Sequence, residues 1–451
     1  MDETMGINLK YRPGVAALAF AGALGWSVPG SALQPLDAFV ASAHKTNPNL
    51  RASAALNEQR DAEADRATGA LLPAIQAQGV YTRNQYQIEF PKGLFPTDGM
   101  LPTPDSATSG GTIKVLPYNQ LDATFSLSVP LIDVGGWARR RAARATSEMA
   151  SADLDNTRNE IARQVARSYF QLLAVEAVLG AAQRALQLSQ QNAQLTLERR
   201  DAGTASELDV QRARGDVARA EQDVAASNLN VALTRRALET LSGLSPEPSA
   251  EFPADDLAAE QPLATWLGNA KETPAVKSAR AARRAAELGK RAADAAWLPT
   301  VSGTVQERLT NAPALVLKNY YYQAQLNAVW RLDMTIPATV RATKAQADQA
   351  LAKADATVRQ ADDAIFNDWH QVNASIERAR SARTQVEAAS AAAQLAHDRY
   401  EGGVATQLDV LQAQQDLFRA DVGRIQADAD VAYARAALRL DSGLSIGADS
   451  R

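Results

Sequence analysis

The 451-residue sequence contains no cysteine, only three histidines and few aromatic residues (6%). Without cysteine the chain has no disulfide, no thiolate chemistry, no Cys-ligated metal and no lipid-modified N-terminal cysteine. The histidines are scattered and no pair has the spacing of a motif such as HExxH, so we predict neither a metal site nor a cofactor: His44, His370 and His397. A formal net charge of −4 provides no basic surface for a nucleic-acid partner.

Long apolar runs are missing except near the N-terminus. There, Lys10 and Arg12 precede a mostly apolar stretch over residues 15–28, and small residues follow at 30–32. This order predicts a secretory signal peptide over residues 1–32, because the apolar stretch is too short to span a membrane comfortably. The alternative is a buried N-terminal helix. With no run near 20 apolar residues elsewhere, a membrane crossing by this chain would have to be a β-barrel.

The sequence contains an internal duplication. Residues 47–50 match residues 273–276 and Leu72-Pro73 matches Leu298-Pro299, both 226 positions apart. Farther on the spacing becomes 200 positions, where residues 203–210 match 403–410 and residues 241–244 match 441–444. The first copy therefore carries 26 more residues, which we place in a Pro/Gly/Ser-rich extended loop at 84–118. We expect repeats at 33–244 and 263–444, an irregular linker at 245–262 and a tail at 445–451.

Each copy contains two segments in which apolar and polar residues alternate. They cover residues of about 73–84, 119–131, 299–310 and 320–331. Alternation with a period of two predicts strands with one apolar face, and roughly ten residues suffice to cross a bilayer as a tilted strand. A half-buried sheet in a soluble protein is the alternative. Four strands cannot close a barrel, so closure in a membrane needs further copies; the pattern does not choose between two and three.

Long amphipathic helices follow each strand pair. We expect them at about 136–202, 206–243, 340–401 and 407–442, with shorter helices at 49–71 and 275–297 before the first strand of each copy. A helix of some sixty residues is about 90 Å long. Alanine dominates the apolar stripes, which favours a wall of closely packed helices over a two-stranded rope.

The two turns between the long helices resemble those of the TolC family of outer-membrane export channels. The resemblance is carried by Gly203-x5-Asp209-Val210 and by Arg399-Tyr400-Glu401-Gly402-Gly403-x5-Asp409-Val410-Leu411. It implies an α-dominated membrane protein of the non-lipidated type: a homotrimer with a twelve-stranded barrel in outer-membrane lipid and a periplasmic tunnel of coiled helices. It also implies a passive export duct whose partners are a periplasmic adaptor and an inner-membrane pump.

The same resemblance assigns roles to residues at the turns. Asp409 matches an aspartate that faces the pore at its constriction, where three copies would form an acidic ring that favours cations. Tyr400 and Asp209 match positions that form a latch between neighbouring coils in the closed channel. The alternative for both aspartates is that an acid in the first turn of a helix is favoured by the helix dipole, regardless of any gate.

Three glycines let the chain reverse at the turns, and we expect them to act as hinges: Gly203, Gly402 and Gly403. Two positions depart from the family pattern. Gln412 stands where a second acidic ring can occur, and Ala405 stands where a latch arginine can occur. The second ring and the second latch are therefore not expected in this chain.

Two other classes of function fit the sequence less well. A periplasmic coiled-coil adaptor linking the membranes would carry one helical hairpin and no lipid-compatible strands. An enzyme has no support, since the sequence shows no nucleophile–base pair, phosphate loop or metal cluster. The cargo stays open between drugs, metals, proteins and other substrates.

Overall fold

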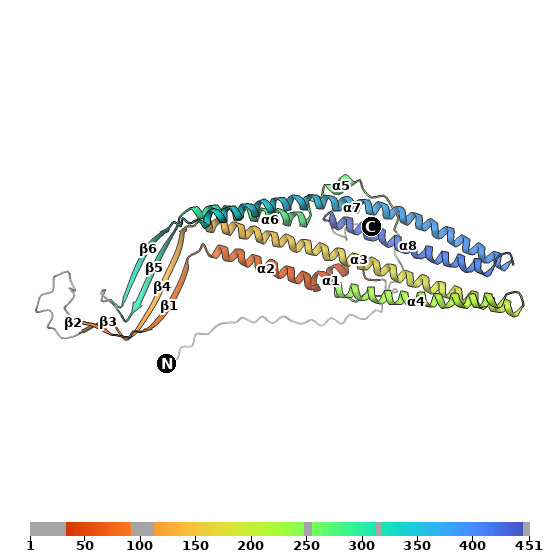
Figure 1. The fold of residues 1–451 in the computed structure, drawn as a ribbon, viewed down its shortest axis with the longest axis horizontal. Coiled ribbons are helices and arrows are strands. Elements are labelled where there is room, and N and C mark those ends of the chain that lie inside the picture. The colour runs from red at the N-terminus through yellow and green to blue at the C-terminus, as the bar shows by residue number, and fades with distance from the viewer. Residues whose placement is uncertain (1–32, 92–111, 248–254, 313–317, 445–451) are drawn as a thin grey trace, which may run out of the picture.

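The computed structural model describes residues 33–91, 112–247, 255–312 and 318–444. The molecule is elongated, with a β-sheet at one end and two helical hairpins at the other (Figure 1). The expected signal peptide at 1–32, the tail at 445–451 and part of the 84–118 loop lie outside the described residues.

The sheet contains four antiparallel strands in the order β1-β4-β5-β6. They are β1 (Ala74–Arg83), β4 (Asn119–Ile132), β5 (Thr300–Thr310) and β6 (Tyr320–Val329). The two strands of the first copy pair with those of the second through β4 and β5, in register from Asp122 opposite Thr310 to Ile132 opposite Val301. Strands β1 and β6 are consequently the two open edges. Strand β6 ends at Val329, where the alternation of apolar and polar residues stops.

The register gives each face of the sheet one chemical character. Leu127 lies opposite Ile75 on one side and Val305 on the other, so apolar side chains share one face. Ser126 and Gln306, which are paired, share the other face with polar neighbours. Ile75 is 82% exposed, which shows that no other part of the described chain covers the apolar face at this position.

The prediction of an extended loop at 84–118 is partly wrong. Strand β2 (Ile88–Pro91) pairs with strand β3 (Thr112–Leu116) in a separate antiparallel sheet beyond β1 and β4. The prediction treated the whole insertion as irregular because of its prolines and glycines. Its two ends instead carry short runs rich in β-branched and aromatic residues, a composition that favours strands.

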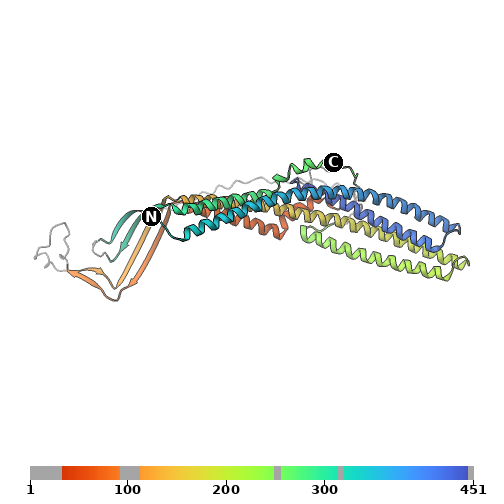
Figure 2. The ribbon, with the colours of Figure 1, turned by 45° about the horizontal axis from the view of Figure 1, so that its top comes forward.

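The helices form one layer that extends from the sheet. The first copy contributes α1 (Leu36–Thr46), α2 (Pro48–Gly69), α3 (Val134–Asp201) and α4 (Glu207–Ser242), and the second contributes α5 (Leu263–Leu267), α6 (Pro274–Asp294), α7 (Thr335–Glu401) and α8 (Gln407–Asp441). Two 3-10 turns, Ala270–Glu272 and Ala295–Trp297, flank α6. Helix α3 packs against α2 and α6 near the sheet and against α4 and α8 toward the tips, as Figures 1 and 2 show.

Duplicated positions are buried in both copies. Leu172 and Val372, which are 200 positions apart, are both 0% exposed, and so are Leu238 and Leu438. A small apolar cluster of Ala174, Ala181, Ile425 and Ala429 joins α3 to α8. Small alanine side chains allow these helices to approach closely, which confirms the expected wall of packed helices. Helix α3 also contains a stretch apolar enough by composition to cross a membrane, but that helix packs against α1, α4 and α8.

Candidate functional site at the helix turns

The two hairpin turns have the same backbone geometry. Gly203 and Gly403 have φ values of +75° and +74°, the left-handed region that a residue with a Cβ rarely adopts. Gly402 differs, since its φ of −76° lies in the ordinary helical region at the C-cap of α7. Among the three glycines proposed as hinges, only Gly203 and Gly403 therefore occupy positions whose backbone requires glycine.

Matching carbonyl groups close both turns. The backbone oxygen of Arg199 accepts the N–H of Thr204 at 2.8 Å, and the oxygen of Arg399 accepts the N–H of Val404 at 2.9 Å. These bonds satisfy carbonyl groups that would otherwise be unpaired at a helix C-terminus. The turns are thus built from local interactions that the duplicated sequence repeats.

Both aspartates of the turn motif form a capping box. The Asp209 carboxylate accepts the Ser206 N–H at 3.2 Å, and the Asp409 carboxylate accepts the Thr406 N–H at 2.8 Å. In return, each aspartate N–H donates to the hydroxyl oxygen of that Ser or Thr. Hydrogen bonds from the Thr406 hydroxyl and then from its backbone N–H lower the pKa of Asp409. The exposed Asp409 side chain therefore stays ionised to a lower pH than an ordinary aspartate side chain does.

The two aspartates differ in the charge around them. Arg212 lies one turn beyond Asp209, and its guanidinium is 3.8 Å from the Asp209 Oδ1. The equivalent position in the second copy is Gln412, and within the described residues Asp409 has no basic partner. Of the two turn aspartates, therefore, only Asp409 lacks an arginine that compensates its charge within the described residues. The first-turn capping role is common to both aspartates, so it does not account for this difference.

A cation–π contact joins the two hairpins just above their turns. The Arg199 guanidinium carbon lies 4.3 Å from the centre of the Tyr400 ring, and Arg199 Nη1 donates to the Tyr400 carbonyl at 3.1 Å. These contacts tie the end of α3 to the end of α7. In the part of the chain that the structure describes, no hydrogen bond joins Tyr400 to Asp209, so the latch proposed for that pair would have to form between chains.

Gln407 is the second residue at the tip that the sequence did not single out. It is the first residue of α8, it is 3% exposed, and neither of its side-chain amide atoms has a hydrogen-bond partner. A buried amide without a partner is costly. Its equivalent in the first copy, Glu207, is exposed and pairs with Arg200. The recurrence of arginine at positions 199 and 399 could have singled out Arg199 as a candidate residue of the turns. Nothing in the sequence indicated that Gln407 is buried.

Midway along the helices, the segment between the repeats is held across α7 and α8. We call residues 255–261 the strap. Arg383 donates to the Asp255 carbonyl at 3.0 Å, Arg380 donates to the Leu257 carbonyl at 2.9 Å, and Arg435 donates to the Ala258 carbonyl at 2.7 Å. Leu257 has a φ of +54° and is 6% exposed, so the strap holds an unfavourable backbone in order to bury this side chain.

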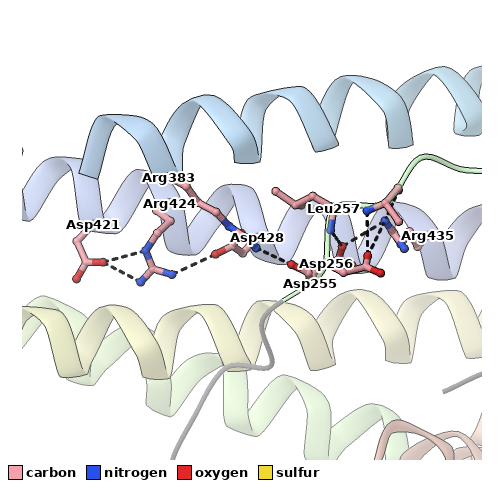
Figure 3. A network of polar contacts seen from close by, with 9 residues as sticks. Asp255, Asp256, Leu257, Arg383, Asp421, Arg424, Asp428 and Arg435 are labelled. Carbon is pink, nitrogen blue, oxygen red and sulfur yellow. Dashed lines mark hydrogen bonds and ion pairs between the residues drawn. The ribbon is translucent and has the colours of Figure 1, made fainter. Parts of the chain in front are cut away.

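A chain of ion pairs extends from the strap toward the tips (Figure 3). Asp428 on α8 is 3% exposed and accepts two bonds from Arg383, at 2.9 and 3.2 Å, and one from Arg424 at 3.1 Å. Arg424 also binds Asp421, which pairs with Arg184 of α3 at 3.2 Å. The network therefore connects the strap, α7, α8 and α3.

Removing the buried carboxylate of this network should destabilise the protein strongly. Asp428→Ala leaves Arg383 and Arg424 without their shared partner. Both arginine side chains are about one-third exposed, so the loss of these charged hydrogen bonds costs about 1.5–3 kcal/mol. We expect the midpoint of thermal unfolding, followed by circular dichroism in detergent, to fall by several degrees. Asp430→Ala is the matched control, because Asp430 is 60% exposed and 3.9 Å from Arg378. Equal midpoints for the two variants would contradict the role of the network.

Comparison with known proteins identifies the architecture. The model of a family described as outer membrane efflux protein matches residues 40–244 and 269–443, which is most of the chain. The chain belongs to this family. Its sequence is 26% identical over 360 residues to the toluene efflux pump outer membrane protein TtgC of Pseudomonas putida, covering 75% of this chain and 72% of TtgC.

Solved structures share the fold. The outer-membrane channel OprN superposes with a TM-score of 0.76 at 22% identity, covering 91% of this chain and 90% of OprN. The Neisseria gonorrhoeae MtrE channel superposes with a TM-score of 0.74 at 18% identity, covering 93% and 91%. The family match confirms three expectations from the sequence: the resemblance to outer-membrane export channels, the outer-membrane location extending into the periplasm, and the export function. An adaptor protein is correspondingly not favoured.

Proposed function

We propose that three copies of this chain form one channel whose barrel closes between neighbouring sheets. The observation that carries the proposal is the pair of open edges, β1 and β6, on a sheet whose apolar face is exposed. Open edges cannot remain unpaired in lipid. Two copies would give eight strands, a number whose interior is filled by side chains. Three copies are the smallest assembly that closes the edges and leaves a lumen for export.

The polar face of the sheet supports a water-filled lumen. Arg308 of β5 forms an ion pair with Asp122 of β4 at 2.8 Å and donates to the Tyr321 hydroxyl of β6 at 3.3 Å. All three side chains lie on the same face as Ser126 and Gln306. Polar side chains inside a barrel and apolar side chains toward lipid are the arrangement found in membrane barrels.

We propose that the channel closes at the turns of the helices. Three copies of Asp409 would form an acidic ring there, and Asp209 and Tyr400 of neighbouring coils would form a latch. Gly203 and Gly403 supply the left-handed backbone of the turns, and Gly402 ends α7 beside them. The charge of Asp409 supports its place in the ring, because a residue that only caps a helix does not need an unpaired charge.

The partners are proposed to be a periplasmic adaptor and an inner-membrane pump, with small molecules as cargo. TtgC is named for toluene efflux, and ArpC, also 26% identical, is named for antibiotic efflux. The tips of this chain expose apolar side chains that a docking protein would cover: Leu208 (57%), Val404 (82%) and Leu408 (51%). Exposed apolar residues clustered at a functional end are typical of interaction sites.

Disulfide cross-linking between β1 and β6 tests the number of copies. Within one chain these edges are three strand spacings apart, about 14 Å, which exceeds the reach of a disulfide. The chain has no native cysteine. We expect Gln78→Cys, combined in turn with Gln323→Cys, Gln325→Cys or Asn327→Cys, to yield a covalent product of three chains on oxidation of the membrane-embedded protein. Single variants serve as controls. A product that stops at two chains would contradict the trimer.

A further inference from the structure

A groove lies where the sheet meets the helices, and no step proposed above uses it. It has a volume of about 420 Å³ and lies between the end of β4, the first turns of α3 and the last turns of α6. Its apolar wall contains Leu131, Ile132, Trp137 and Leu288. Leu131 and Ile132 are each 54% exposed and Trp137 is 58% exposed, so none of the described residues covers this wall.

The groove lies between elements that are internal to the chain. Strand β4 has β1 and β5 on its two sides, and α3 and α6 pack directly against each other. A neighbouring copy that pairs through β1 or β6 would therefore meet the chain elsewhere. The apolar wall of this groove faces an environment other than the partner subunit of the proposed barrel.

Tryptophans mark the depth of the groove relative to a membrane. Trp137 follows β4, Trp297 precedes β5 and Trp330 follows β6, so all three lie at the same end of the sheet. They are 58%, 44% and 64% exposed, and Trp330 Nε1 donates to the Trp297 carbonyl at 3.0 Å. Exposed tryptophans gather where a membrane meets water. The groove therefore lies at the border between lipid and the periplasm.

Two arginines with unpaired side chains line the groove. Within the described residues, neither the Arg141 nor the Arg291 side chain forms a hydrogen bond or an ion pair. Asp133 also lines it, but its carboxylate accepts the Gly136 N–H at 2.7 Å and pairs with Arg139 at 3.1 Å. Two arginines beside an apolar wall can bind a phosphate while the wall contacts a hydrocarbon chain.

We propose that this groove binds an anionic phospholipid of the periplasm-facing leaflet. Arg141 and Arg291 contact the phosphate, and Leu131, Ile132 and Trp137 contact the upper part of an acyl chain. Basic pockets at the membrane border bind anionic head groups in the same way. Free phosphate would leave the apolar wall uncovered. The proposal rests on the placement of the sheet in the membrane described under Proposed function.

Native mass spectrometry of the detergent-extracted full chain tests the site. Phosphatidylglycerol and zwitterionic phosphatidylethanolamine are added separately, and the bound lipid is counted per chain. We expect phosphatidylglycerol to be retained about tenfold more than phosphatidylethanolamine, and Arg141→Gln combined with Arg291→Gln to abolish this preference. The control double variant removes the same charge from exposed arginines without partners elsewhere on α6 and α7, Arg280→Gln with Arg359→Gln, and should retain the preference.

Three results would overturn the proposal. They are equal retention of the two lipids by the unchanged protein, unchanged preference in the Arg141/Arg291 variant, and displacement of phosphatidylglycerol by millimolar inorganic phosphate. The last result would mean that the arginines bind free phosphate. Because lipid is counted per chain, these outcomes are independent of the β1–β6 cross-link. A trimer without lipid preference overturns only the groove, whereas a failed cross-link with retained preference overturns only the barrel.

Discussion

Asp409→Asn is expected to reduce the preference of the channel for cations over chloride by about fivefold, as measured by reversal potentials in planar bilayers. The variant keeps an oxygen that can accept the Thr406 N–H, so the start of α8 should remain capped. It removes a charge that has no basic neighbour in the described part of the chain. In a trimer the substitution removes three negative charges around one axis, so the effect on selectivity should be large.

The duplication supplies a matched control for this prediction. Asp209→Asn changes the equivalent residue of the first copy, whose charge is already paired with Arg212. We expect it to leave the selectivity nearly unchanged. If the two variants have the same reversal potential, Asp409 is a helix cap and not a part of the constriction.

The dependence of selectivity on pH gives an additional check on Asp409. Hydrogen bonds from Thr406 lower the pKa of this carboxylate, so the folded state holds its charge to lower pH than an ordinary aspartate. The cation preference should therefore persist as the pH falls through the usual range for aspartate, and it should disappear only at lower pH. A loss of preference already in mildly acidic buffer would mean that another group carries the selectivity.

Arg199→Ala is expected to make the closed channel leak. The variant removes the cation–π contact with Tyr400 and the bond to its carbonyl, interactions that together contribute about 1–3 kcal/mol per chain. Because the contact joins α3 to α7, its loss frees the two hairpins to move apart. We expect at least about a tenfold increase in basal conductance in bilayers, and higher sensitivity of cells to large antibiotics.

Arg399→Ala is the control for this second prediction. Arg399 is the equivalent residue of the other turn and is exposed, and its side chain has no partner within the described residues. Its backbone carbonyl, which closes the turn, is unaffected by the substitution. An equal leak in the Arg399 and Arg199 variants would assign the effect to a loss of positive charge at the tip and would exclude a role for the Arg199–Tyr400 contact.

Tyr400→Phe separates the Arg199–Tyr400 contact from the proposed latch between Tyr400 and Asp209. Phenylalanine keeps an aromatic face for Arg199 but lacks the hydroxyl that would bond to Asp209 of a neighbouring coil. If the latch contributes to closure, Tyr400→Phe leaks although the Arg199 contact is preserved. Conductance equal to that of the unchanged protein would remove the Tyr400–Asp209 bond from the gate and leave Arg199 as the tie between hairpins.

Much of the architecture could be predicted because its signals are local. Side chains that alternate every two residues produced the strand prediction, and the register from Ala74 opposite Ser128 onward places the apolar residues on one face. The turn prediction depended on glycines whose left-handed backbone is a property of the turn itself. The capping boxes are equally local, since Ser206 and Thr406 lie three residues before their aspartates. The duplication added a second, independent sample of each signal.

Local composition also misled the prediction in one place. The insertion at 84–118 contains enough proline and glycine to indicate a loop as a whole. Its ends nevertheless pair as β2 and β3. The Asn84 N–H donates to the Tyr118 carbonyl at 2.8 Å, and this bond brings the two ends of the insertion together. The partners in β2 and β3 are 21 to 28 positions apart, and a pairing over that separation has no signature in a short window of sequence.

The sequence by itself determined the duplicated plan, the strands with one apolar face, the long helices and the reversals at Gly203 and Gly403, because each depends on residues a few positions apart. Only the tertiary structure decided that Arg199 lies on the ring of Tyr400, that the strap is held by Arg383 and Arg435, and that Arg141 and Arg291 share a groove. These contacts depend on the rotation and offset of packed helices, which alanine-rich interfaces constrain weakly in the sequence. The acidic turns show the boundary between the two. The motif placed Asp209 and Asp409 alike, and the structure shows that, within the described residues, only the charge of Asp209 is paired with an arginine.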